Sequence, residues 1–225
     1  MYRNILFIAV LAIVSCKDSA KQAQDVSSDN AMAEMTVPER LAAAHGFDHW
    51  ADVSEITFTF NVDRDTMHFE RGWIWNVREN RVTRIMQGDT LSYLRSEVDS
   101  TLTQADGNFI NDKYWFLAPY QWVWDQKNIQ WEMEGGATAP ISGETMDKFT
   151  IVYGDSGGYT PGDAYDFYIG ADSLVAEWVF RRGNQPEPGL VTTWEGYEEH
   201  GGLKLSTMHQ NQEGFKLYFT GVSVK

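Results

Sequence analysis

Alternating apolar and polar residues fill most of the chain after residue 54. Aromatic and aliphatic side chains tend to recur at every second position within short runs, and clusters of Gly, Asn and Asp separate these runs. Successive side chains of a β-strand point to opposite faces, so a period of two predicts half-buried strands. The predicted strands are 56–62, 69–77, 82–86, 91–94, 129–133, 149–153, 165–169, 174–180, 191–197, 203–208 and 215–224.

The connections between these strands are mostly short, and 135–143 is expected to be a polar loop. No intervening run predicts a helix long enough for a parallel βαβ unit, so the sheet should be antiparallel. In the last strand the apolar positions change from odd to even numbers between Phe219 and Val222, which predicts a β-bulge near Gly221. A short helix should begin at Pro38, with Thr36 as its N-cap and Gly46 as its stop.

The segment 109–124 interrupts the strand pattern with an unusual density of aromatic residues. Seven of its sixteen residues are Phe, Tyr or Trp. We interpret this segment as a plug or lid around which a curved sheet closes. The predicted fold class is therefore mainly β (α+β): a strongly curved antiparallel sheet, or incomplete β-barrel, with one or two helices covering its concave face.

Composition and charge restrict the class of protein. The chain of 225 residues is 43% hydrophobic, which suffices for a single β-rich domain with a sizeable core. Its formal net charge of −14 would repel a phosphate backbone, so we expect no nucleic-acid partner. The same charge gives no attraction to an anionic bilayer, so any membrane attachment needs another basis.

The N-terminal residues suggest such a basis. Arg3 precedes an apolar run over 5–14, which is too short to span a bilayer and is typical of a signal peptide. The run ends at Cys16, the single cysteine, in the manner of a bacterial lipobox. We therefore expect a lipoprotein signal peptide over 1–15, an acylated Cys16 with a flexible tether over 16–36, and one domain over 37–225. The expected location is the cell envelope, with the protein anchored to the outer membrane on its periplasmic or surface face.

Four segments resemble a known family. They read AAAHGFDHWADVSEITFTF, NDKYWFLAPYQ, YTPGDAYDFYIGADSLVAEWVF and TTWEGYEEHGGLKL. Together they resemble LolA/LolB-like lipoproteins, relatives of outer-membrane lipoprotein sorting proteins, many of which have no assigned ligand. The resemblance implies an antiparallel half-barrel whose apolar concave face, covered by helices, shelters lipid or acyl chains. Cys16 departs from the soluble carriers of that family and favours a membrane-bound receiver or an unrelated role.

Catalytic motifs are weak. Gly-Asp-Ser-Gly-Gly at 154–158 spells the nucleophile motif of trypsin-like proteases, and His45 lies in an Ala-Ala-His segment, with Asp99 as the nearest third member. That hydrolase family needs two barrels and a defined mutual geometry, neither of which the pattern predicts. The alternative interpretation of 154–163 is a glycine-rich loop between two strands.

Other polar groupings are equally ambiguous. His45 and His49 have the i, i+4 spacing of zinc ligands, but Gly46 should end the helix between them. Glu132 and Glu134 share a strand face, and oxygen-bearing residues at 106–112 could approach calcium without forming a full binding loop. We expect no metal and no cofactor.

The tryptophans offer the remaining candidate site. Nine of them exceed what a filled core of this size needs, so some should line a cavity, although a fully packed core is the alternative. The first hypothesis is a non-catalytic protein that binds an apolar molecule or acyl chain; the second is a structural module that binds an envelope partner. The candidate cavity residues are Trp73, Trp75, Tyr114, Trp115, Phe116, Trp122, Trp124 and Trp178.

Overall fold

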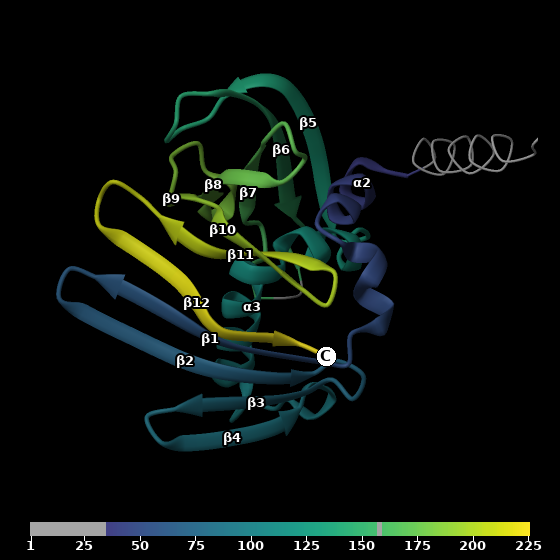
Figure 1. Cartoon of the computed structure of the whole chain (residues 1–225), viewed down its shortest axis with the longest axis vertical. Coiled ribbons are helices and arrows are strands. Elements are labelled where there is room, and N and C mark those ends of the chain that lie inside the picture. The colour runs from purple at the N-terminus through teal and green to yellow at the C-terminus, as the bar shows by residue number, and fades with distance from the viewer. Residues whose placement is uncertain (1–34, 157–158) are drawn as a thin grey trace, which may run out of the picture. The chain divides into compact units, whose positions relative to one another are not determined.

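The computed structural model describes residues 35–156 and 159–225, and the compact unit is Val37–Lys225. The predicted signal peptide, Cys16 and most of the predicted tether lie outside the described residues. Within the unit two antiparallel sheets face a long central helix, α3 (Figure 1). The predicted class, a mainly β architecture that stays open and carries a few helices, is confirmed.

The seven-stranded sheet has the order β10-β11-β12-β1-β2-β3-β4. Its strands are β1 (Glu55–Arg64), β2 (Met67–Asn76), β3 (Arg81–Met86), β4 (Asp89–Leu94), β10 (Glu195–His200), β11 (Leu203–Gln210) and β12 (Phe215–Val224). The five-stranded sheet has the order β5-β6-β7-β8-β9. Its strands are β5 (Ile129–Thr138), β6 (Thr145–Tyr153), β7 (Ala164–Ile169), β8 (Val175–Arg181) and β9 (Leu190–Thr193).

The predicted strand 191–197 is wrong as a single element. The chain leaves the five-stranded sheet at Thr193 and enters the seven-stranded sheet at Glu195. Trp194 marks the change: its side chain is buried, and its backbone N–H donates to the Ala176 carbonyl of β8. Apolar alternation continues through the change, so the pattern alone does not reveal that two sheets are involved.

The segment 109–124 forms part of a helix, α3 (Thr103–Trp124), whose length the sequence pattern did not predict. Residues from both sides of α3 are buried, including every residue from Trp115 to Tyr120. A helix with buried residues on several faces lacks the one-sided apolar stripe from which helices are recognised. Pro119 lacks the N–H of a regular turn, and the backbone departs from helical angles at Leu117, so α3 is kinked there.

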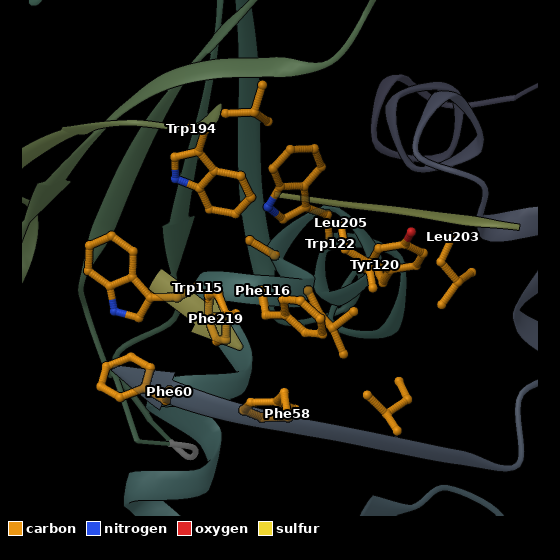
Figure 2. Packing of buried hydrophobic residues seen from close by; sticks show 14 of the residues in the cluster. Phe58, Phe60, Trp115, Phe116, Tyr120, Trp122, Trp194, Leu203, Leu205 and Phe219 are labelled. Carbon is orange, nitrogen blue, oxygen red and sulfur yellow. The ribbon is translucent and has the colours of Figure 1, made fainter. Parts of the chain in front are cut away.

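α3 joins the two sheets through aromatic contacts. The Phe116 ring lies 5.2 Å from Phe58 and 4.6 Å from Phe219, both in the seven-stranded sheet (Figure 2). The Trp122 ring lies 4.9 Å from Phe149 and 4.7 Å from Phe167 in the five-stranded sheet. The aromatic segment is therefore the shared core of both sheets, which agrees with its interpretation as a plug.

The register between paired strands shifts at three places in the described residues, one of them between β7 and β8 at Tyr168/Ile169. The register of β1 against β12 shifts beside Gly221, whose φ is 61°, so the predicted bulge is confirmed. A second shift lies in β5 between Glu134 and Ala137. The predicted loop 135–143 is therefore wrong at its start, because Gly135 and Gly136 form a bulge inside β5 and the strand continues to Thr138.

The first helix, α2 (Val37–Ala44), ends as predicted. Gly46 follows it with a φ of 91°, a conformation that glycine adopts without steric cost. Short 3-10 helices follow at Phe47–Asp52, at Arg95–Glu97 before α3, and at Arg182–Asn184 after β8. Within the described residues, none of the helices combines the length and apolar composition needed to cross a bilayer.

Candidate ligand cavity

A cavity of about 800 Å³ lies beside α3, at the end of the five-stranded sheet. We call it the α3 cavity. One side is formed by α3 and the turn after it, and the other by β6, β7, β8 and the loop between β6 and β7. The described lining residues are Arg95, Gly107, Ile110, Asn111, Lys113, Tyr114, Trp115, Gln121, Asp125, Asn128, Tyr153, Gly154, Ser156, Tyr159, Thr160, Asp163, Tyr165, Trp178, Phe180, Arg182 and Leu190.

Packed aromatic rings form the apolar wall. Tyr165 of β7 and Trp178 of β8 stack with their centroids 5.3 Å apart and their planes 24° apart. Tyr114 and Trp115 of α3 contact this pair, with 4.9 Å from Tyr114 to Tyr165 and 4.2 Å from Trp115 to Trp178. Phe180 extends the wall, 5.3 Å from Tyr165. The wall offers flat, rigid surfaces that suit apolar chains or rings.

Lys113 forms the polar part of the wall. Its side chain is buried, and its Nζ donates to Gln121 Oε1 at 2.5 Å. Gln121 Nε2 donates in turn to Asp125 Oδ2 at 2.7 Å. Nζ also lies 4.9 Å from the Trp124 ring and 5.4 Å from the Trp75 ring. Burial, reinforced by the charge of Arg95, lowers the pKa of Lys113 to about 7.

Asp106 fixes the loop beside the cavity to α3. Its carboxylate accepts hydrogen bonds from Arg95 Nε at 2.8 Å, Tyr93 Oη at 3.2 Å and Tyr159 Oη at 2.8 Å. Burial acts to raise the pKa of Asp106, but the hydrogen bonds from Arg95 and Tyr159 outweigh it, and the pKa lies below its ordinary value. Gly107 leaves room for the Tyr159 ring, which would lie 3.3 Å from an added Cβ.

The structure separates the eight predicted aromatic residues into two groups. Tyr114, Trp115 and Trp178 line the α3 cavity. The remaining five pack elsewhere in the core or along its edge, as in the Phe116 and Trp122 contacts described above; they are Trp73, Trp75, Phe116, Trp122 and Trp124. Five of the eight residues lie on α3, which presents different faces to the two sheets and to the cavity, and the other three lie on β2 and β8.

Sequence reasoning missed the polar lining residues and four aromatic ones. Tyr153, Tyr165 and Phe180 appeared only as strand residues, Tyr159 only as part of the loop 154–163, and Lys113 and Gln121 received no role. A signal was present in the spacing of Gly107, Ile110, Tyr114 and Gln121, which recur at helical intervals along α3. It becomes informative only once 103–124 is recognised as a helix.

The protease motif is not assembled. Ser156 lines the α3 cavity, but His45 does not. His45 Nδ1 lies 2.7 Å from the Leu41 carbonyl, and its Nε2 lies 3.3 Å from Tyr197 Oη, so both ring nitrogens are engaged elsewhere. Asp99 accepts hydrogen bonds from Thr101 and the Leu102 N–H at the start of α3. The three residues therefore have separate structural roles.

The other polar groupings also have structural explanations. Glu132 and Glu134 lie exposed on β5, an edge strand. Asp106 is occupied by Arg95 and two tyrosines, and Asp112 by Arg71 and Trp73. Across residues 35–156 and 159–225, no three His, Cys, Asp or Glu side chains gather as they would around a metal ion.

The fold and the cavity together define a class of protein. Two open antiparallel β-sheets pack against one central helix, α3, and a cavity lies beside that helix. No known protein family matches the chain, and no curated protein sequence matches it. Among solved structures, a DUF1329 family protein from Desulfovibrio piger is similar, with a TM-score of 0.45 and 11% identity over 84% of this chain and 92% of that chain. Membership of the LolA/LolB-like family stays a prediction.

Proposed function

We propose that this protein binds a small molecule with a long apolar part, such as a lipid or acyl chain, in the α3 cavity, and that it catalyses no reaction. An acylated Cys16 would hold it at a membrane of the cell envelope. The observation that carries the proposal is a cavity of about 800 Å³, part of whose wall is formed by packed aromatic rings. Ligand cavities in proteins commonly measure about 300–1,000 Å³ and have such walls.

Burial of apolar area is a sufficient driving force for this binding. Removing apolar surface from water contributes about 25 cal/mol per Å², so a chain of ten or more carbons gains several kcal/mol on entering the cavity. The wall residues Trp115 and Trp178 are already packed against each other, so little ordering is needed on binding.

Displacement of a fluorescent fatty acid tests the proposal. The mature chain, residues 16–225, produced in the cytoplasm so that Cys16 stays unacylated, should bind dansyl-undecanoic acid saturably and release it to unlabelled lipids. Ile110→Trp replaces an aliphatic side chain that lines the cavity with a bulky indole ring, which should fill the cavity and abolish binding. Ile85→Trp is the matched control, because Ile85 is exposed on β3, and it should bind normally. Absence of saturable binding, or binding unchanged by Ile110→Trp, would overturn the proposal.

The membrane anchor has its own test. Mass spectrometry of the protein purified from its native membranes should find a mature chain that begins at Cys16 and carries acyl chains. Several acyl chains together would attach the protein stably, whereas one would not. A mature chain that lacks lipid on its first residue would remove the anchor from the proposal and leave the cavity unaffected.

A protein-binding module is the second candidate function, and the exposed edge of the five-stranded sheet favours it. Among the residues that the structure describes, β5 pairs with β6 alone, and it exposes Trp131 at 40% and Met133 at 38%. An unpaired edge with apolar side chains can accept a strand of another protein. Cross-linking in intact cells through a photoreactive residue at position 131 should capture an envelope partner if this candidate is right; a residue placed at exposed Lys127 is the control.

A further inference from the structure

We infer that the ligand of the α3 cavity carries a carboxylate and that the ammonium group of Lys113 binds it. This inference rests on the proposed function and specifies its ligand class. The starting observation is geometric: Lys113 lines the cavity while only 3% of the residue is exposed. Its Nζ has one hydrogen-bond acceptor among the described residues, the neutral oxygen Oε1 of Gln121.

The charges of Asp125 and Asp106 act to raise the pKa of Lys113, but neither carboxylate accepts a hydrogen bond from Nζ. Asp125 accepts from Gln121, and Asp106 accepts from Arg95 and Tyr159. Within the described parts of the chain, Lys113 forms no ion pair with any of them. A buried ammonium without a directly paired counter-ion is costly, so proteins seldom keep one unless it is used. An anion entering the cavity would supply the missing charge and a second acceptor.

The charges of the wall favour a singly charged ligand. Arg95 is neutralised by Asp106, and Arg182 is exposed at the rim. Asp125 and Asp163 also line the cavity and would repel a second negative charge. A phosphate monoester carries nearly two charges, whereas a carboxylate carries one, which matches the single buried ammonium. The aromatic wall directly follows Lys113 in the sequence at Tyr114 and Trp115, so the apolar body would extend along it.

Three probes that share one alkyl chain and differ in their head group test which group Lys113 binds. They are dodecanoate, dodecanol and dodecyl phosphate. The mature chain should bind dodecanoate about 30-fold more tightly than dodecanol, because the buried charge pair forms only with the acid. Lys113→Met keeps the length of the side chain and should bring the two affinities together. Lys127→Met removes the same charge from an exposed lysine outside the cavity and should change neither affinity. Circular dichroism of each variant checks that it is folded.

Proton uptake provides a second readout that a purely structural lysine would not give. At pH 8 the unliganded Lys113 is mostly neutral, since its pKa is about 7. Binding of the acid should restore the charge, so calorimetry in buffers of different ionisation enthalpy should report uptake of close to one proton per ligand. Lys113→Met should abolish the uptake, and Lys127→Met should retain it.

The outcomes are distinguishable. Failure of all three probes to bind would overturn the proposed function and the inference together. Equal affinity for dodecanol and dodecanoate, or unchanged dodecanoate binding by Lys113→Met, would overturn the inference and leave the cavity as a binding site. Tighter binding of dodecyl phosphate than of dodecanoate would overturn the assignment of a carboxylate.

Discussion

Arg71 of β2 and Asp112 of α3 form a buried ion pair that joins the seven-stranded sheet to the central helix. The guanidinium donates from Nε at 2.8 Å and from Nη2 at 2.9 Å to the two carboxylate oxygens. Trp73 Nε1 donates to the same carboxylate at 2.8 Å. These hydrogen bonds fix the position of α3 relative to β2. They therefore also fix the position of Lys113, which follows Asp112 in the chain.

This pair should show strong energetic coupling. Asp112→Ala leaves the guanidinium and the Trp73 N–H without an acceptor, and Arg71→Met leaves a buried carboxylate without its cation, so each should cost about 3–5 kcal/mol of unfolding free energy. The double variant removes both charges and should lose at least about 2 kcal/mol less than the sum of the single losses. Urea unfolding of the four proteins measures this difference, and simple additivity would contradict the prediction.

Gly46 should be far less tolerant of substitution than another glycine with nearly the same backbone conformation. The φ of Gly46 is 91° and that of Gly214 is 84°, so alanine meets a similar conformational cost of about 1 kcal/mol at both. Only at Gly46 would the added Cβ overlap another group, the Gly202 carbonyl oxygen, at 2.1 Å.

The measurement compares thermal unfolding of the two alanine variants. Gly214→Ala should lose about 1 kcal/mol, and Gly46→Ala more than about 3 kcal/mol, because α2 must move away from the turn before β11. Similar losses for both would show that this contact is not tight in solution.

The strands were predictable from sequence because alternation is a local signal that burial on one face imposes. The turn at Gln87–Gly88 and the bulge at Gly221 were predictable for the same reason, since each residue type meets a local backbone requirement. The length of α3 was not predictable, because a helix that buries residues on several faces carries no one-sided pattern. The sequence also did not show which sheet each strand belongs to, because the strand that it pairs with can lie far away in the sequence. The change of sheet at Trp194 is an example.

The candidate site was predictable only in part for a related reason. Aromatic residues are conspicuous in a sequence, so Tyr114, Trp115 and Trp178 were singled out with five others that fill the core. Lys113 was not singled out, because a single lysine in an ordinary sequence has no feature that shows its burial. Its environment depends on α3, β2 and the turn after Trp124 meeting in space.

Two buried histidines should make the fold sensitive to mild acid. Burial lowers the pKa of His45 to about 4 and that of His209 to about 3, so both are neutral in the native protein down to those values. The unfolded chain protonates both near pH 6.5. Since the unfolded state binds more protons below pH 6.5, stability should decrease as pH decreases, by about 2 kcal/mol between pH 6 and pH 5.

His209→Leu separates the two contributions. The His209 ring packs among aromatic residues, 4.7 Å from Trp194 and 5.3 Å from Trp115, so leucine fits the apolar surroundings. Chemical unfolding of this variant should show about half of the pH dependence of the native protein over the same interval. His49→Gln, at an exposed position, is the control and should retain the full dependence.

Lys113→Met should stabilise the unliganded protein near neutral pH. The native pKa of about 7 lies far below the unfolded value of 10.5, so the unfolded state binds more protons between these values and the native state becomes more stable as pH rises. Between pH 7 and pH 9 this contribution should amount to about 2 kcal/mol. Methionine has no charge to desolvate and should show no such increase, so the advantage of the variant should shrink as pH rises.

Urea unfolding of both proteins at pH 7, 8 and 9 measures the difference, with Lys127→Met as a control for the change in net charge. A constant difference across this range would mean that Lys113 keeps its charge in the native protein at all three values. The predicted decrease would instead show that the buried ammonium destabilises the empty fold. A residue that weakens the fold in this way is expected where binding requires it, because selection for stability alone would replace it with an apolar side chain.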